Sequence, residues 1–292
     1  MEGLQEIAKK ILPGGLSCDL DPMDASRKLA QVKADTFNAS RGDLNEKGKL
    51  GGIDCPKCLN RGFIMTAVEV KAGQYETRVR ECGCMVVRRN IRRLERSGLK
   101  DVTRMYTFKK YKTDENWQER IKLAAMDYVT SVKNGENGWF FIGGQSGCGK
   151  THICTAIAVQ LLKSQMDLRY MVWRDEARKL KAVANSPEYT EMLNEFKQVK
   201  VLYIDDFLKS GRDSSGNMKP TDADVALAFE LLNYRNNNRD LLTIISSELT
   251  LEEIADIDEA IAGRIAQNAE RHRLVIARKP GRNYRLKGVV EL

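Results

Sequence analysis

Eight consecutive residues near the middle of the chain have the types and spacing of a loop that binds phosphate. They read Gly144-Gln145-Ser146-Gly147-Cys148-Gly149-Lys150-Thr151. Glycines let the backbone wrap closely around phosphate groups with its N–H groups pointing inward, because side chains would block that approach. Lys150 can reach the terminal phosphates, and the Thr151 hydroxyl can bind Mg²⁺. The pattern Gly-x-x-x-x-Gly-Lys-Thr predicts a nucleoside triphosphate site, and the alternative is a glycine-rich turn without a ligand.

A second motif ends in two carboxylates. Val201-Leu202-Tyr203-Ile204 is a continuous apolar run, typical of a parallel strand buried on both faces, and Asp205 and Asp206 follow it. We expect Asp205 to hold Mg²⁺ and Asp206 to orient or deprotonate the attacking water. Many such sites carry glutamate at the second position, so the shorter aspartate predicts slow hydrolysis. Two solvated acids at a strand end are the alternative.

The elements around these motifs alternate between strand and helix. We predict a strand over 139–142, a helix over 152–162, and further strands over 169–173, 201–206 and 241–247. This alternation is typical of an α/β fold with a parallel sheet, whose ligands bind at the carboxyl ends of the strands. We expect the strand bearing the two acids to neighbour the strand that precedes the loop, and the dipole of the following helix to favour phosphate.

Helices are also predicted in the C-terminal part of the chain. Residues 175–183 have helical character, Thr221 and Asp224 resemble a capping box, and residues 251–269 read as mostly helical. Arg264 in this last segment could reach the phosphates of a neighbouring subunit and stabilise charge in the transition state. A plain surface arginine is the alternative.

Two cysteine pairs precede this core. Cys55-Pro-Lys-Cys58 and Cys82-Gly-Cys84 flank two segments of strand character, 63–70 and 75–81. A hairpin would bring the pairs together, and four converging thiolates make a closed tetrahedral Zn²⁺ site with a structural role. The second pair is Cys-x-Cys rather than Cys-x-x-Cys, so the match to a common zinc ribbon is imperfect. Four free cysteines beside a hairpin are the alternative.

A basic helix is predicted over residues 85–98. Val87, Ile91 and Leu94 fall on one face, five arginines (Arg88, Arg89, Arg92, Arg93 and Arg96) cover the rest, and Gly98 can end the helix. Residues 78–104 hold nine basic and three acidic side chains, so they carry most of the net charge of +8. The helix could bind nucleic-acid phosphate or an acidic protein partner, or it could be a solvated face.

Length and composition limit the class of protein. A chain of 292 residues suggests two domains, which we place at 1–104 and 105–292. Seven cysteines in such a chain are more often thiols or metal ligands than disulfides. No apolar run reaches the length of a membrane span, and residues 1–12 lack the apolar centre of a signal peptide. We therefore expect a cytoplasmic protein that does not bind a membrane.

Together these motifs resemble a known family. The segments GGQSGCGKTH, VLYIDD, IISSELTLEE and AGRI are similar to those of DnaC/DnaI-type helicase loaders of the AAA+ superfamily. The cysteine pairs resemble the zinc-binding N-terminal module of the DnaI-like branch, which is common in phages and Gram-positive bacteria. The resemblance covers roughly residues 50–290.

The resemblance implies an AAA+ P-loop ATPase domain with a parallel sheet, preceded by a small zinc-binding domain. It implies a factor that binds the hexameric replicative DNA helicase through its N-terminal module, responds to single-stranded DNA and forms a homo-oligomer. Catalytic roles fall on Lys150, Asp206 and Arg264, and Mg²⁺ binding falls on Thr151 and Asp205. The residues implied to contact ATP or ADP are Gly144, Gln145, Ser146, Gly147, Cys148, Gly149, Lys150, Thr151, His152, Asp205 and, as the candidate phosphate sensor, Ser247.

Two other functions fit part of the pattern. A transposition helper of the IstB kind has a similar core but generally lacks the cysteine module, so the four cysteines favour the loader. A zinc-stabilised adaptor for nucleic acid, using ATP only as a switch, is compatible with the short carboxylate at Asp206.

Overall fold

The computed structural model describes residues 22–96, 106–212 and 218–286. The chain divides into two compact units, Met1–Met85 and Val86–Leu292, and each is described by itself. The domain boundary predicted between residues 104 and 105 lies outside the described residues. None of the helices in these three ranges has the length and apolar character needed to cross a membrane.

The first unit is a helix against a hairpin. Helix α2 (Pro22–Ala39) lies on the antiparallel strands β1 (Phe63–Lys71) and β2 (Gln74–Glu81), as predicted for the hairpin. The Asn38 side chain accepts from Met65 N and donates to Met65 O, which ties the helix to β1. The register pairs Phe63 with Glu81, so the pairing ends next to Cys82.

The second unit is built on a five-stranded sheet. Its strands lie in the order β4-β5-β8-β3-β9, and each neighbouring pair is parallel, which confirms the predicted fold class. Their bounds are β3 (Trp139–Gly144), β4 (Leu168–Val172), β5 (Val201–Asp205), β8 (Leu242–Ser246) and β9 (Arg273–Ile276). The expectation that β5 neighbours β3 is wrong, because β8 lies between them. Serines at the end of β8 therefore stand between the phosphate loop and the two acids.

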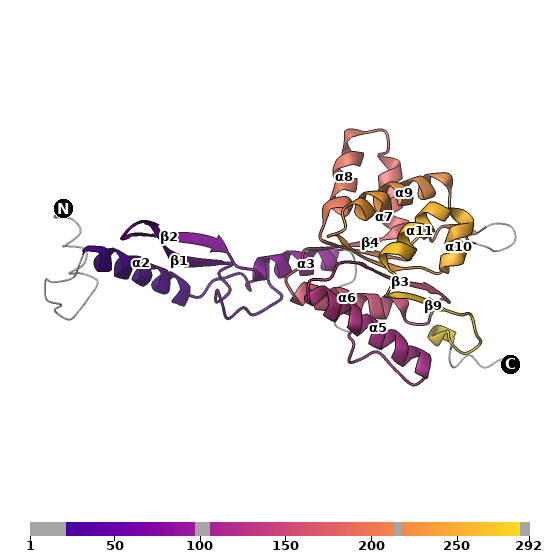
Figure 1. The fold of residues 1–292 in the computed structure, drawn as a ribbon, viewed down its shortest axis with the longest axis horizontal. Coiled ribbons are helices and arrows are strands. Elements are labelled where there is room, and N and C mark those ends of the chain that lie inside the picture. Colours follow the sequence, from indigo (N-terminus) through magenta and orange to yellow (C-terminus); the bar gives the residue numbers. More distant parts are fainter. Residues whose placement is uncertain (1–21, 97–105, 213–217, 287–292) are drawn as a thin grey trace. The chain divides into compact units, whose positions relative to one another are not determined.

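Helices cover both faces of this sheet (Figure 1). One face packs on α5 (Asn116–Lys133) and α6 (Lys150–Lys163). The other packs on five helices: α7 (Trp173–Ala182), α8 (Pro187–Gln198), α9 (Asp222–Asn237), α10 (Leu251–Ile257) and α11 (Glu259–Asn268). The expected capping box of α9 is present, since Thr221 and Asp224 each accept from the other's backbone N–H. The segment 251–269, expected to be mostly helical, forms two helices, because Asp258 ends α10 and caps α11.

The basic helix forms as α3 (Cys84–Arg96), but its surface differs from the expected one. Arg88 and Asn90 are fully buried with Val87, whereas Arg92 is exposed. The Asn90 amide donates to Met166 O at 2.8 Å, so the helix packs through a polar side chain as well as through its apolar stripe. Gly98, the predicted end of this helix, and the side chains of Arg93, Leu94 and Arg96 lie outside the described residues.

Short elements complete the described chain. Strands β6 (Gly211–Arg212) and β7 (Met218–Lys219) pair with each other, and η1 (Tyr284–Leu286) follows β9. Within residues 271–286, strand structure is confined to β9 (Arg273–Ile276). The backbone N–H of Tyr284 donates to Gly147 O at 3.0 Å, so η1 begins against the phosphate loop.

Candidate nucleotide-binding site

The phosphate loop joins strand β3, which lies between β8 and β9, to the start of α6. Gly144, Gly147 and Gly149 all have positive φ values, and Gly149 caps α6 at φ 94°. A Cβ atom on Gly144 would lie 2.1 Å from Ile276 O of β9, so the loop can leave the sheet only with glycine here. This conformation turns the first N–H groups of α6 toward the loop, which suits phosphate binding at a helix N-terminus.

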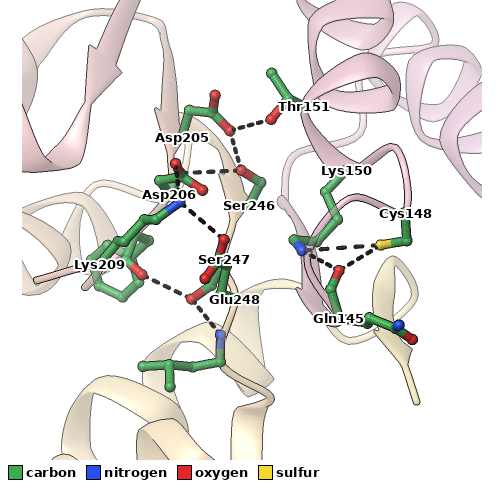
Figure 2. A network of polar contacts seen from close by, with 12 residues as sticks. Gln145, Cys148, Lys150, Thr151, Asp205, Asp206, Lys209, Ser246, Ser247 and Glu248 are labelled. Atoms are coloured by element: carbon green, nitrogen blue, oxygen red, sulfur yellow. Dashed lines mark hydrogen bonds and ion pairs between the residues drawn. The ribbon is translucent and has the colours of Figure 1, made fainter. Parts of the chain in front are cut away.

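The Lys150 side chain is folded back onto this loop. Its Nζ donates to Gly144 O at 2.8 Å and to Gln145 O at 2.7 Å, and the residue is 6% exposed (Figure 2). Burial lowers the pKa of the Lys150 ammonium, against the opposing charges of nearby acids. Neutral carbonyls compensate a buried cation only in part, so a phosphate oxygen would be a stronger partner. The lysine fits its predicted role.

Asp205, the last residue of β5, lies beside the start of α6 and is buried. Three hydroxyl groups donate to its carboxylate: Thr151 at 3.1 Å, Tyr170 at 3.0 Å, and Ser246 of the intervening strand β8. Burial raises the pKa of Asp205, and the charge of Asp206 adds to this effect. A buried carboxylate beside the Thr151 hydroxyl offers oxygen ligands of the kind that Mg²⁺ takes. The structure thus brings together the two residues predicted to bind the metal.

Asp206 is in the left-handed region, at φ 55°. This conformation turns the backbone away from β5, and the Asp206 N–H donates to Ser246 Oγ at 3.3 Å. The Asp206 carboxylate lies 3.0 Å from Lys209 Nζ, which in turn lies 2.9 Å from Glu248 Oε1. Neither Lys209 nor Glu248 was predicted as a site residue, although the position of Glu248 just beyond β8 was a signal that could have identified it.

The candidate sensor Ser247 points away from this group. Its side chain is fully buried, its hydroxyl donates to Phe207 O at 2.8 Å, and its oxygen accepts from Leu249 N at 3.1 Å. Side chains alternate between the two sides of a strand and its extension, so Ser246 and Glu248 face the phosphate loop and Ser247 does not. The side chains that face the phosphate loop at this strand end are therefore those of Ser246 and Glu248, and not that of the candidate sensor Ser247.

A pocket of about 360 Å³ lies between the phosphate loop and the group formed by Asp206, Lys209 and Glu248. The loop residues from Ser146 to Thr151, together with Asp206, Lys209 and Glu248, line its polar part. Aromatic side chains form another part, where the Tyr106 and His152 rings are stacked with centroids 4.7 Å apart. His152, predicted as a nucleotide contact, also lies 2.9 Å from Thr107 O through Nε2. The pocket combines a cationic end with a flat aromatic surface, which suits a nucleotide.

Arg264 is absent from the lining of this pocket. Its Nε and Nη2 donate to Asn233 Oδ1 at 3.1 and 2.8 Å, and its guanidinium carbon lies 4.5 Å from the centroid of the Phe229 ring. The guanidinium is therefore held between α11 and α9. A role at the phosphates of a neighbouring subunit stays a prediction.

The four cysteines predicted to bind zinc converge in the first unit. Their sulfur atoms all lie within 4.8 Å of one another, and all four residues are buried. The Cys55–Cys82 and Cys58–Cys84 sulfur distances are 3.8 and 3.5 Å. Tetrahedral Zn–S bonds of about 2.3 Å place sulfur atoms about 3.8 Å apart, so this geometry fits zinc. The Gly62 N–H lies 3.4 Å from Cys58 Sγ, a contact that would stabilise a thiolate.

The fold and site define a P-loop ATPase, with a lysine-bearing loop and paired acids at the carboxyl edge of a parallel sheet. The chain belongs to the family described as IstB-like ATP binding protein, which matches residues 78–289. This membership confirms the predicted ATP-binding and ATPase class.

Two relatives from Bacillus subtilis (strain 168) are similar to most of the chain. The uncharacterized protein YqaM is 32% identical over 265 residues, covering 77% of this chain and 82% of YqaM. The phage-like element PBSX protein XkdC is 31% identical over 245 residues, covering 81% of this chain and 87% of XkdC. Among solved structures, the DnaC helicase loader has a TM-score of 0.48 at 20% identity, over 60% of this chain and 97% of that one.

Proposed function

We propose that this protein is an ATP-dependent loader, which binds a hexameric replicative DNA helicase and helps to place it on single-stranded DNA. The observation that carries the proposal is the convergence of Cys55, Cys58, Cys82 and Cys84 in a unit ahead of the ATPase core. This module separates the loaders from the transposition helpers that share the core. In a loader, this cysteine module would bind the helicase, and ATP would control the second unit.

In the proposed ATPase reaction, Lys150 and the N–H groups of its loop hold the phosphates. Asp206 orients the attacking water and accepts its proton, and the hydrogen bond from its N–H to Ser246 helps to fix its position. Thr151 and Asp205 would hold Mg²⁺, which supplies charge neutralisation on the phosphate oxygens. The short carboxylate at Asp206 supports slow basal turnover that DNA or the helicase stimulates.

A transposition helper is the second candidate. The family match begins at residue 78 and so leaves out Cys55 and Cys58, which means that it covers the ATPase core and only half of the cysteine cluster. A helper would bind double-stranded DNA and a transposase, and it would have no affinity for a helicase.

Co-purification separates these two functions. We expect the full chain to retain the replicative helicase of the same cell when ATP is present, and single-stranded DNA to increase its ATP turnover. Cys58→Ser should lose the helicase but keep nucleotide binding, because Cys58 lies in the first unit and the nucleotide pocket in the second. Failure of the unaltered protein to retain the helicase under any nucleotide condition would exclude the loader.

Arg264→Ala should lower ATP turnover about 100-fold or more without lowering ATP affinity, as for an arginine supplied to a neighbouring subunit. The reason is that Arg264 does not line its own chain's pocket, so it can act only in an assembly. Turnover at increasing protein concentration and nucleotide titration measure the two quantities. Asn233→Ala, which removes the residue that holds this guanidinium, should cause a smaller loss of turnover. A fall in ATP affinity for Arg264→Ala would instead indicate a structural role within one chain.

A further inference from the structure

Lys209 is a second lysine in the phosphate pocket, and the proposed ATPase reaction has not used it. Its Nζ lies between two carboxylates, 3.0 Å from Asp206 Oδ2 and 2.9 Å from Glu248 Oε1 (Figure 2). All three residues line the same pocket as Lys150. Ser146 of the phosphate loop lines this pocket together with Glu248, so this group of charges faces the loop directly.

The backbone holds Lys209 in this position at a conformational cost. Asp206 and Leu208 have φ values of 55° and 58°, in the left-handed region that residues other than glycine seldom adopt. Between them, Phe207 is fully buried and its ring lies 4.9 Å from the Trp173 ring. The Lys209 N–H donates to Asp206 O at 3.0 Å. The base of the Lys209 side chain is therefore anchored, while its ammonium end, on a side chain that is 30% exposed, can move.

The contact between Lys209 and Asp206 conflicts with the role of Asp206 in hydrolysis. A carboxylate that forms an ion pair with an ammonium group is turned toward that partner, so its oxygen is less available to a water molecule at the phosphate. A terminal phosphate carries more negative charge than a carboxylate and would compete for the same ammonium. Burial tends to lower the pKa of Lys209, but its bonds to Glu248 and Asp206 outweigh burial and raise it, so the lysine stays charged.

We propose that Lys209 exchanges Asp206 for the terminal phosphate of a bound nucleoside triphosphate, while Glu248 keeps the ammonium at the pocket. The proposal rests on the assignment of this pocket as the nucleotide site. A diphosphate lacks the group that draws Lys209 away, so Asp206 stays paired in its presence. Lys209 thus makes the pocket discriminate triphosphate from diphosphate and releases Asp206 only when there is a phosphate to hydrolyse.

The test is the ratio of two affinities. Loss of one charge-assisted hydrogen bond corresponds to about a tenfold or greater change in affinity. We therefore expect Lys209→Met to weaken binding of a non-hydrolysable ATP analogue about tenfold or more, and to change ADP binding less than about twofold. Fluorescent-nucleotide titration with Mg²⁺ measures both. Glu248→Gln weakens the contact that keeps the ammonium at the pocket, so it should reduce the preference for the triphosphate, although by less than Lys209→Met does.

Lys179→Met is the matched control, because Lys179 also forms an ion pair with an acid three residues earlier, Glu176, and does not line the pocket. It should change neither affinity. Equal losses of ATP and ADP affinity in Lys209→Met, or no loss of either, would overturn the role of Lys209 while leaving the nucleotide site intact. Absence of binding of both nucleotides to the unaltered protein would overturn the site and this proposal with it.

Discussion

Lys150→Ala is expected to reduce nucleotide binding below detection. Lys150 is the buried cation at the start of α6, and its ammonium is held by two loop carbonyls that a phosphate oxygen can replace. Charge-assisted hydrogen bonds contribute up to about 3 kcal/mol each, and one of this size corresponds to a loss of about 100-fold. The ammonium can meet more than one phosphate oxygen, so the total loss should exceed this value. Titration with a fluorescent ATP analogue measures it.

The control must distinguish a specific loss of nucleotide affinity from damage to the structure of the phosphate loop. Lys163→Ala changes the exposed lysine at the other end of α6 and should leave the affinity unchanged. Lys150→Met keeps most of the apolar stem and should lose binding as completely as Lys150→Ala. Both Lys150 variants should unfold close to the temperature of the unaltered protein in the absence of nucleotide. An unchanged affinity in either one would refute the phosphate role of this lysine.

Removal of metal is expected to unfold the first unit and to leave the second intact. The buried cluster of the first unit consists of the four cysteines and Met85, with Leu44, Leu50, Ile53 and Ile64 packed around it. Such a small apolar core cannot hold the two cysteine pairs together by itself. Structural zinc contributes about 10–16 kcal/mol of apparent binding free energy in small modules. We therefore expect one Zn²⁺ per chain, and rapid proteolysis between residues 40 and 85 once a strong chelator removes it.

Cys58→Ser should lose the bound zinc and become sensitive to protease in the same region. Cys18→Ser changes a cysteine that is not one of the four assigned ligands and should keep a full complement of metal. Nucleotide affinity, measured in the same samples, should stay within about twofold of the unaltered value, because the ATP pocket lies in the other unit. Metal analysis of freshly purified protein that finds no zinc would contradict this assignment.

Local spacing was enough to predict the phosphate loop, the hairpin and the convergence of the cysteines. Each depends on backbone geometry within a few residues or on the ends of one antiparallel pair, so a short pattern contains the necessary information. The acids at the end of β5 were predictable for the same reason, since a continuous apolar run ending in Asp205 and Asp206 is visible in one segment. The sequences of helices α5 and α8 contain no recognisable motif, and these helices were not predicted.

The burial of Arg88 shows where a local pattern is insufficient. Arginine is usually solvent-exposed, so the apolar stripe of Val87 and Ile91 predicted an outward-facing basic surface. In the structure Arg88 is fully buried, and the nearby Asn90 donates to Met166 O. These partners are far apart in the sequence, and hydrophobic periodicity contains no information about such contacts.

The amino-acid sequence by itself determined which groups can bind phosphate and metal: Lys150, Thr151, Asp205, Asp206 and the four cysteines. Only the tertiary structure decided how the other groups of the pocket are arranged. In the sheet, β8 lies between β3 and β5. Ser246 and Glu248 face the loop whereas Ser247 points away from it, and Lys209 forms an ion pair with Asp206. The physical reason is that buried parallel strands look alike in sequence, whereas their order depends on the packing of the whole sheet.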